Sequence, residues 1–236
     1  MPPSLEQAVP LKLPRTPSAV IFDMDGLLFD TEALYQRAIA AAAVEGGYDL
    51  GSASRLMIGL PAAQSRSLLL ELCGPAFPAD ELLAGMFRHF KRIAATDLSL
   101  KPGVVELLDA LDGWQIPRAI ATSSSHATVE DHLQAHGLEN RFNAIVGHGD
   151  CTASKPAPDP FLLAAQRLGV LPHLCLALED SPNGIRSASD AGMMTVMVPD
   201  LIEPTDEIRA LCSFVAHDLH EVRQAVLDAR TGGNWG

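Results

Sequence analysis

The sequence has few basic side chains, few aromatic side chains and no long apolar run. Lysine and arginine number 17 against 29 aspartates and glutamates, which gives a formal net charge of −12 at pH 7. The basic residues do not cluster, so no surface for a nucleic-acid polymer is predicted. No apolar run approaches the roughly 20 residues of a membrane span, and the N-terminus does not read as a secretory signal. We therefore expect a cytoplasmic protein with no membrane partner.

Cysteine is also scarce. No two of the four cysteines have the CxxC spacing of a structural zinc site or a redox pair. We expect reduced thiols, as is typical of a cytosolic protein. The four are Cys73, Cys151, Cys175 and Cys212.

Short apolar runs alternate with helix-patterned segments over most of the chain. Continuous apolar runs suit strands that are buried on both faces of a parallel sheet. The alternation predicts a doubly wound, Rossmann-like α/β domain, whose ligands bind outside the carboxyl ends of the strands. The strand candidates are Ala19–Phe22, Arg118–Ser125, Asn143–Asp150, Leu174–Ser181 and Met194–Asp200. The helix candidates between them are Val104–Leu111, Thr128–His136, Pro160–Leu168 and Gly184–Ala191.

One interval, residues 33–96, breaks this alternation. It is rich in alanine and leucine, contains no strand-like run, and reads as helices closed by Gly46-Gly47 and Gly74-Pro75. The pattern predicts an all-α helical bundle inserted between the first strand and the rest of the sheet. The expected domains are therefore a discontinuous core, residues 17–32 and 97–230, and the insert. Residues 1–16 read as a flexible leader and residues 231–236 as a tail.

Two carboxylates, Asp23 and Asp25, end the first apolar run with one residue between them. Two carboxylates held close repel each other, so this arrangement requires nearby positive charge. A lysine or a bound metal ion supplies it, and oxygen ligands favour a hard cation, with Mg²⁺ the best fit. The alternatives are helix-capping aspartates or a calcium loop. The calcium loop fits poorly, because Gly26 directly follows Asp25 and Asp30 lies too far along the chain.

Other strand ends carry complementary groups. The second run ends in hydroxyl residues that include Thr122 and Ser123, and small hydroxyl residues at a helix start suit an anion. Lys155 lies on a proline-rich loop before a helix, and a second acid pair, Glu179-Asp180, ends the fourth run. Each feature alone is weak, but together at one edge of a parallel sheet they predict a catalytic site.

This ordered set resembles the motifs of the haloacid dehalogenase superfamily of phosphohydrolases, in the subgroup with a helical cap. DMDGLLFDTE, from Asp23, is similar to the first motif. The resemblance implies that residues 33–96 cap the active site and that Mg²⁺ is the cofactor. It implies that Asp23 is the nucleophile that becomes an aspartyl-phosphate, that Asp25 is the general acid and base, and that Lys155 offsets negative charge. Thr122 and Ser123, with Lys155, would bind the phosphoryl group, and the metal would be held by Asp23, the Asp25 carbonyl, Glu179 and Asp180.

Asp25 favours phosphoryl transfer over dehalogenation, because a departing halide needs no proton. The predicted enzyme is a phosphoric monoester hydrolase acting on a small phosphorylated metabolite, such as a sugar phosphate, a polyol phosphate or a nucleotide. A phosphomutase of the β-phosphoglucomutase type is the first alternative. It is weakened because the cap arginine of that enzyme falls near Ala62 here and its histidine appears as Tyr35. A non-catalytic phosphometabolite-binding protein is the second alternative.

Substrate specificity is expected to lie in the insert. Tyr35, Gln64 and Arg66 are the candidate substrate contacts, although each also reads as an ordinary core or surface residue. The sequence is compatible with a monomer or a weak dimer.

Overall fold

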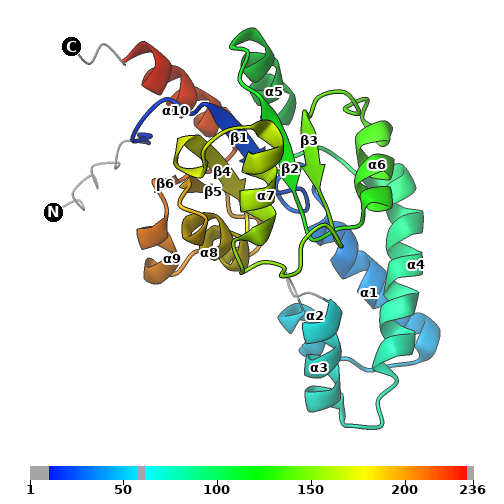
Figure 1. Ribbon diagram of the computed structural model, residues 1–236. Coiled ribbons are helices and arrows are strands. Elements are labelled where there is room, and N and C mark those ends of the chain that lie inside the picture. The colour runs from blue at the N-terminus through cyan, green and yellow to red at the C-terminus, as the bar shows by residue number, and fades with distance from the viewer. Residues whose placement is uncertain (1–10, 58–61, 233–236) are drawn as a thin grey trace, which may run out of the picture.

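The computed structural model describes residues 11–57 and 62–232. Its centre is a parallel sheet of six strands in the order β3-β2-β1-β4-β5-β6, which confirms the doubly wound class (Figure 1). The five predicted strands are present, and the first has the predicted bounds. The sixth was not predicted, because a two-residue edge strand leaves no apolar run to detect. The strands are β1 (Ala19–Phe22), β2 (Arg118–Ala121), β3 (Ala144–Val146), β4 (Cys175–Glu179), β5 (Met194–Met197) and β6 (Phe214–Val215).

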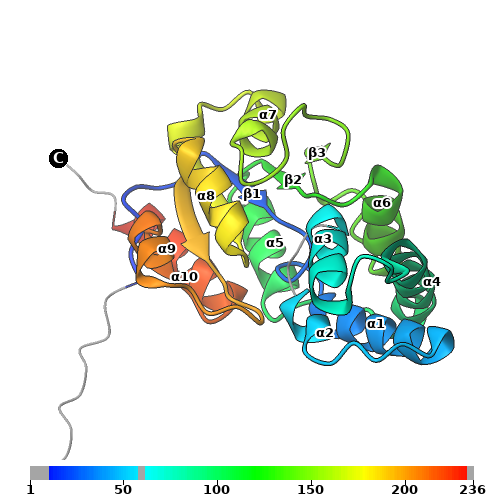
Figure 2. The same ribbon diagram turned by 90° about the horizontal axis from the view of Figure 1, so that it is seen from below.

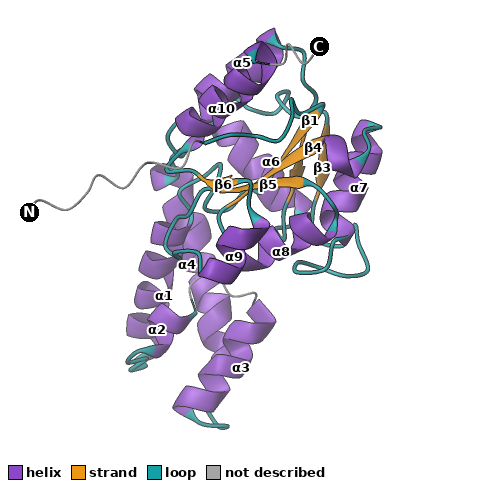
Figure 3. Cartoon of the chain, turned by 90° about the vertical axis from the view of Figure 1, so that its left-hand side faces the viewer, coloured by secondary structure: helices purple, strands orange, loops and turns teal. Residues whose placement is uncertain are grey.

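Both faces of the sheet are covered, which explains why the strands are apolar throughout. In β1, Val20 and Phe22 pack with α5, α6 and α10, whereas Ala19 and Ile21 pack with α7 and α8 on the opposite face. Figure 3 shows α5 and α10 on one side of the sheet and α7 and α8 on the other. The core helices are α5 (Val104–Gly113), α6 (His126–Ala135), α7 (Asp159–Leu168), α8 (Pro182–Asp190), α9 (Asp206–Leu211) and α10 (Leu219–Thr231), with a 3₁₀ turn at Pro172–Leu174.

Two helices begin directly after central strands because a serine caps each of them. Ser125 accepts a hydrogen bond from the Thr128 amide at the start of α6, and Ser181 accepts one from the Gly184 amide at the start of α8. These caps bring the amino ends of α6 and α8 to the carboxyl edge of the sheet.

The insert forms a separate helical layer with its own apolar core, as predicted (Figures 1 and 2). Its two long helices pack through residues such as Leu34 and Ile39 on one side and Leu82 and Phe90 on the other. Gly47, at φ +67°, ends the first helix in the left-handed conformation that glycine allows. The helices are α1 (Glu32–Gly46), the short α2 (Ala53–Leu56), α3 (Ala62–Cys73) and α4 (Ala79–Asp97).

The two connections of the insert to the core run side by side. The Asp30 amide donates to the Ser99 carbonyl at 2.9 Å, and the Lys101 amide donates to the Leu28 carbonyl at 3.0 Å. Phe29 and Leu100 form an antiparallel bridge between these hydrogen bonds. The insert therefore leaves and rejoins the core at one place.

The segment before β1 contacts the core where it is described. Leu13 is buried in the main core, and the Thr16 hydroxyl donates to the Ala229 carbonyl at 2.7 Å. The rest of the predicted leader, residues 1–10, and residues 233–236 of the predicted tail lie outside the described residues. All four cysteines are free. Within the described ranges, no helix is long and apolar enough to cross a membrane.

Candidate active site

The site residues predicted in the core meet at the carboxyl ends of β1, β2 and β4. Phe22 pairs with Ile120 on one side and with Leu178 on the other, so the residues that follow these three lie at one level. β1 is the strand at which the chain order reverses across the sheet, and that switch point is where α/β folds bind their ligands.

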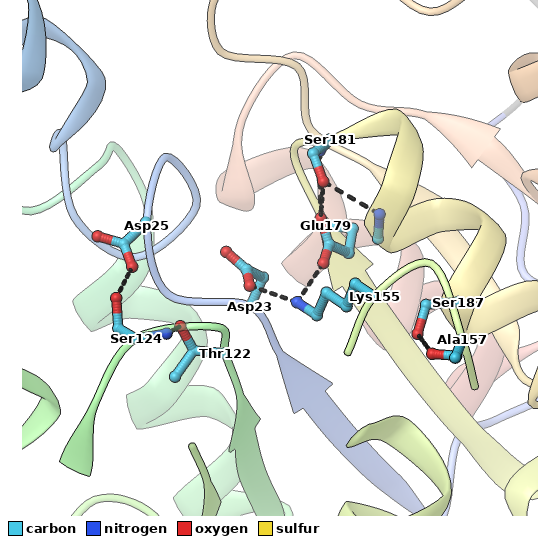
Figure 4. Close-up of polar contacts among 10 residues, drawn as sticks. Asp23, Asp25, Thr122, Ser124, Lys155, Ala157, Glu179, Ser181 and Ser187 are labelled. Carbon is cyan, nitrogen blue, oxygen red and sulfur yellow. Dashed lines mark hydrogen bonds and ion pairs between the residues drawn. The ribbon is translucent and has the colours of Figure 1, made fainter. Parts of the chain in front are cut away.

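Asp23, Lys155 and Glu179 form a buried ion-paired cluster (Figure 4). The Lys155 ammonium lies 2.5 Å from Asp23 Oδ1 and 2.5 Å from Glu179 Oε1. Asp23 is 6% exposed and Glu179 is fully buried. Burial alone would lower the pKa of Lys155, but the two carboxylates raise it above its ordinary value. Lys155 is therefore held as a cation against the carboxylate that follows β1.

Negative charge nevertheless exceeds positive charge in this cluster. Burial, followed by the charges of Glu179 and Asp25, raises the pKa of Asp23 to about 8 even though Lys155 opposes the shift. Burial, Glu179 and Asp23 likewise raise the pKa of Asp180 well above its usual range. One lysine does not balance these carboxylates, and a further cation would lower both pKa values.

Three of these carboxylates fit a metal ion. Oxygen atoms of Asp23, Glu179 and Asp180 all lie within 4.8 Å of one another. An all-oxygen set of acidic ligands suits a hard divalent cation. The donor set and the excess negative charge thus agree with a metal site at this position.

Two glycines make room for the acid pair after β4. A Cβ atom on Gly26 would lie 2.3 Å from Asp180 Oδ2, and Gly26 also has a φ of +82°. A Cβ atom on Gly184 would lie 1.8 Å from a carboxylate atom of Glu179. Both contacts are far below a normal van der Waals separation, so the positions of the two carboxylates depend on glycine at these sites.

The Asp25 carboxylate contacts a different partner from the one that the Asp23 carboxylate contacts. Its Oδ2 accepts a hydrogen bond from the Ser124 hydroxyl at 2.7 Å, whereas Asp23 faces Lys155 (Figure 4). The other oxygen, Oδ1, is buried without a hydrogen-bond partner among the described residues. The two carboxylates therefore have separate surroundings, which suits separate chemical roles.

The hydroxyl residues after β2 are arranged differently from one another. Thr122 is buried, and its Oγ1 accepts a hydrogen bond from the Ser124 amide at 3.1 Å. Ser123 is exposed and lines the cavity above the strand ends. The contact between Ser124 and Asp25 was not predicted. The sequence shows the run of hydroxyl residues, but it does not indicate which of them hydrogen-bonds Asp25.

Ser181 is a second contact that sequence reasoning missed. Its hydroxyl donates to Glu179 Oε2 at 3.0 Å, and its amide donates to the same oxygen at 3.2 Å. Glu179 is thereby held from both sides, by Lys155 and by the turn that begins α8 (Figure 4).

A cavity of about 1260 Å³ lies over the cluster, between the insert and the core. Tyr35 lines it and stacks on Phe90 with ring centroids 4.0 Å apart, so one predicted substrate residue does reach the cavity. Gln64 and Arg66 are not among the described residues that line it. The Arg66 guanidinium is instead paired with Asp80 at 2.8 and 3.1 Å. Residues 58–61 of the predicted cap loop lie outside the described ranges.

Comparison with known proteins identifies similar sequences and similar structures. A family model described as haloacid dehalogenase-like hydrolase matches residues 20–198. A probable pseudouridine-5′-phosphatase from Drosophila melanogaster is 38% identical, with 80% of this chain and 84% of that protein covered. The fructose-1-phosphate phosphatase YqaB from Escherichia coli is 36% identical, with coverage of 77% and 96%. The crystal structure of a putative β-phosphoglucomutase from Thermotoga maritima has a TM-score of 0.75 at 27% identity, with coverage of 89% and 98%.

Proposed function

Because this chain belongs to the haloacid dehalogenase-like hydrolase family, we propose that it is a phosphatase that hydrolyses a small phosphomonoester through an aspartyl-phosphate on Asp23. One observation carries the proposal: the Asp23 carboxylate lies at the end of the central strand, paired with the buried Lys155, on the floor of a large cavity. Phosphatases among its relatives, at 36% and 38% identity, support the reaction class.

The two aspartates have different roles in the first chemical step. A carboxylate oxygen of Asp23 attacks phosphorus, and the bond between phosphorus and the ester oxygen breaks. Asp25, protonated at this stage, gives its proton to the departing oxygen, so the alcohol leaves neutral. Its separate position beside Ser124 supports this role, because the acid must reach the leaving group without competing for the phosphorus.

The second step returns the enzyme to its starting state. Asp25, now a carboxylate, removes a proton from a water molecule that attacks the phosphorus of the aspartyl-phosphate. The bond between the Asp23 oxygen and phosphorus breaks, which releases inorganic phosphate and regenerates the carboxylate. Thr122 and Ser123 would donate hydrogen bonds to the phosphoryl oxygens, and Lys155 would offset their charge.

The acidic cluster is the proposed Mg²⁺ site. Asp23, Asp180 and the Asp25 main-chain carbonyl would hold the ion, with Glu179 close by. When bound, Mg²⁺ would stabilise the negative charge that develops on the transferred phosphoryl group. The mutual proximity of the carboxylate oxygens and the raised pKa of Asp180 support this assignment.

The helical insert is the proposed cap. Residues 33–96 would close over the strand ends, and the core would comprise residues 17–32 and 97–230. Support comes from the cavity, whose lining includes Tyr35 and Phe90 of the insert and Asp23 and Thr122 of the core. Closure would exclude water other than the attacking molecule from the reaction.

A phosphomutase requires a second cationic site for a second phosphate, and the described part of the cavity does not favour one. The lysines that line it are Lys155, which is paired with two carboxylates, and Lys91, whose side chain is 85% exposed. The Arg66 guanidinium is paired with Asp80 instead. These contacts favour hydrolysis of a monophosphate over transfer between two positions of a bisphosphate.

The deciding experiment measures phosphate release from a panel of sugar, polyol and nucleoside monophosphates, with Mg²⁺ and with EDTA. We expect release with Mg²⁺, loss of release with EDTA, and none from Asp23→Asn. Wild-type release by Asp23→Asn would refute the assigned nucleophile. Isomerisation of a glucose phosphate without phosphate release would identify a mutase, and binding without either reaction would identify a binding protein.

A further inference from the structure

A buried histidine with an unsatisfied nitrogen lines the cavity. His132, on the core helix α6, is 5% exposed. Its Nδ1 is buried and has no hydrogen-bond partner among the described residues. Buried polar atoms in native proteins almost always have a partner. Because the residue also borders the cavity and no described residue accepts or donates a hydrogen bond at Nδ1, the imidazole is available to a ligand held in that cavity.

His132 lies where the core meets the insert. Its ring is 5.3 Å from that of Phe29, at the connection to the insert, and 6.1 Å from that of Phe90 on α4. The helices α4 and α6 lie side by side in Figures 1 and 2. A substrate bound between the insert and the core would therefore lie beside this imidazole.

The surroundings keep the imidazole neutral. Burial lowers the pKa of His132 and outweighs the charges of Asp25 and Asp131, which raise it, while His136 adds to the lowering. A neutral imidazole has one N–H donor and one nitrogen acceptor. A hydroxyl group is also both a donor and an acceptor, so it can pair with either nitrogen.

The wall beside His132 is aromatic. Tyr35 and Phe90 stack at an interplanar angle of 12°, and both line the cavity. An aromatic wall can contact the carbon-bound hydrogens of a polyol while a few polar groups bind its hydroxyls. Lys91 also lines the cavity here, and its ammonium lies 3.9 Å from the Asp131 carboxylate, so the two charges offset each other.

We propose that His132 and the stacked pair Tyr35–Phe90 form the leaving-group subsite, in which His132 hydrogen-bonds a hydroxyl of an uncharged polyol. The inference rests on the proposed phosphatase function and narrows its substrate to the monophosphate of a sugar or a related polyol. His132 is a specificity-determining residue in this arrangement, and the bond-breaking steps belong to Asp23 and Asp25.

The chain offers a matched control for this role. His136 lies one turn further along the chain, at the C-cap of α6; its ring is 5.5 Å from that of Phe29, and its Nε2 is buried without a hydrogen-bond partner among the described residues. Unlike His132, it is not among the described residues that line the cavity. Replacement of either histidine removes an imidazole packed against Phe29, buried at His132 and half-buried at His136, but only the change at His132 alters the cavity.

The test compares His132→Leu, His132→Asn and His136→Leu on two kinds of ester. Fructose 1-phosphate, ribose 5-phosphate and glycerol 3-phosphate carry hydroxyls, whereas cyclohexyl phosphate and p-nitrophenyl phosphate carry none on the leaving group. For the best polyol phosphate, we expect His132→Leu to raise KM at least tenfold, because leucine cannot form the hydrogen bond that the imidazole makes to a substrate hydroxyl. Its kcat/KM for cyclohexyl phosphate should change less than twofold. His132→Asn should recover part of the loss, and His136→Leu should leave both kinds of substrate within twofold of wild type.

Equal losses of His132→Leu on polyol and cyclohexyl phosphates would overturn the inference, because they would indicate a purely structural role. A wild-type enzyme that hydrolyses only the esters without hydroxyls would overturn the inference and leave the phosphatase proposal standing. Absence of phosphate release from every ester would overturn the phosphatase proposal itself. Thermal unfolding of the three variants identifies any loss that arises from misfolding, and His132→Asn provides the test if His132→Leu does not fold.

Discussion

The Ser124 hydroxyl donates a hydrogen bond to Oδ2 of Asp25 across the space between the ends of β2 and β1, with 2.7 Å between the two oxygens. Ser124 contacts Asp25, so its role differs from the phosphate binding that is proposed for Thr122 and Ser123. It fixes the direction in which Asp25 points. The proposed proton donor is thereby held by the turn that follows β2.

Replacement of Ser124 by alanine should therefore affect esters according to their leaving group. We expect Ser124→Ala to lower kcat about tenfold for alkyl phosphates, because the lost hydrogen bond contributes about 0.5–1.5 kcal/mol and Asp25 loses its orientation. p-Nitrophenyl phosphate should be less affected, since its leaving group needs no proton. Steady-state kinetics on both esters measures this split. Ser124→Thr keeps the hydroxyl and should retain most of the activity. An equal loss on both esters would exclude the orienting role.

Gly184 provides a test of the space around Glu179. We expect Gly184→Ala to lower stability by about 1–3 kcal/mol, as overpacking of a buried site does, and to reduce turnover, because the new Cβ displaces the carboxylate that holds Lys155. Urea unfolding and phosphate release measure the two effects. Gly113→Ala is the matched control, since nothing lies within 4 Å of a Cβ atom there. A Gly184→Ala variant as stable and active as Gly113→Ala would show that the site tolerates the added atom.

Lys155 should be needed for stability as well as for turnover. Loss of one partner of a buried ion pair costs about 3–5 kcal/mol, because the remaining charge is uncompensated. We expect Lys155→Met to lose stability of this order in urea unfolding without added metal. The double variant Asp23→Asn/Lys155→Met should lose less than the sum of the two single variants, since it removes a charge of each sign. Strict additivity would mean that the two side chains are not coupled.

Binding of Mg²⁺ should be measurable without turnover. A ligand that binds only the folded state raises its stability, so Mg²⁺ should raise the Tm of wild type. Asp180→Asn removes one of the three clustered carboxylates, and we expect it to need about 10- to 100-fold more Mg²⁺ for the same rise. Glu203→Gln, at an exposed glutamate outside the cluster, serves as the control. An unchanged Mg²⁺ response in Asp180→Asn would remove that residue from the site.

Asp150 should make stability depend on pH in the acidic range. Burial alone would raise its pKa, but the Gly147 amide, Arg167 and His126 together lower it to about 2. A carboxyl group whose pKa is lower in the folded than in the unfolded protein stabilises the folded state. This contribution is complete above the unfolded-state pKa of about 4 and is lost as the pH falls from about 4 toward 2. We expect Asp150→Asn to cost about 1–2 kcal/mol at pH 7 and progressively less below pH 4.

Urea unfolding of wild type and variant at pH 7, 5, 4 and 3 measures this trend. Asp190→Asn is the control, because Asp190 is exposed and no ion pair is observed for it among the described residues. A difference between Asp150→Asn and wild type that stays constant from pH 7 to pH 3 would contradict the assignment.

The sequence predicted the fold well because its signals are local. Ala19–Phe22 is a continuous apolar run bounded by polar residues, and the strand has the same bounds. Asp23, Lys155 and Asp180 were placed together because each follows a strand or precedes a helix at one edge of a parallel sheet. Their roles in the reaction stay predictions until variants are measured.

The details that the sequence did not predict depend on contacts between distant segments. Whether Ser123 or Ser124 reaches Asp25 depends on the turn after β2, and 99 positions separate Ser124 from Asp25. Arg66 reads equally well as a phosphate ligand and as a surface residue. Its pairing with Asp80 arises only when α3 and α4 pack together. A two-residue strand such as β6 forms because β5 offers a free edge, and its own sequence carries no comparable signal.

The pairing of residues 28–30 with residues 99–101 affects how the sequence of such a chain can vary in evolution. Because the insert begins and ends at one short two-stranded junction, its length and sequence can vary without moving β1, β2 or the catalytic groups that follow them. Exchange of residues 33–96 with the corresponding segment of a relative would then change the residues that the insert contributes to the cavity, such as Tyr35 and Phe90, while His132 and the groups at the strand ends stay in place. The junction thus separates a segment that can vary from the strands that position the proposed catalytic residues.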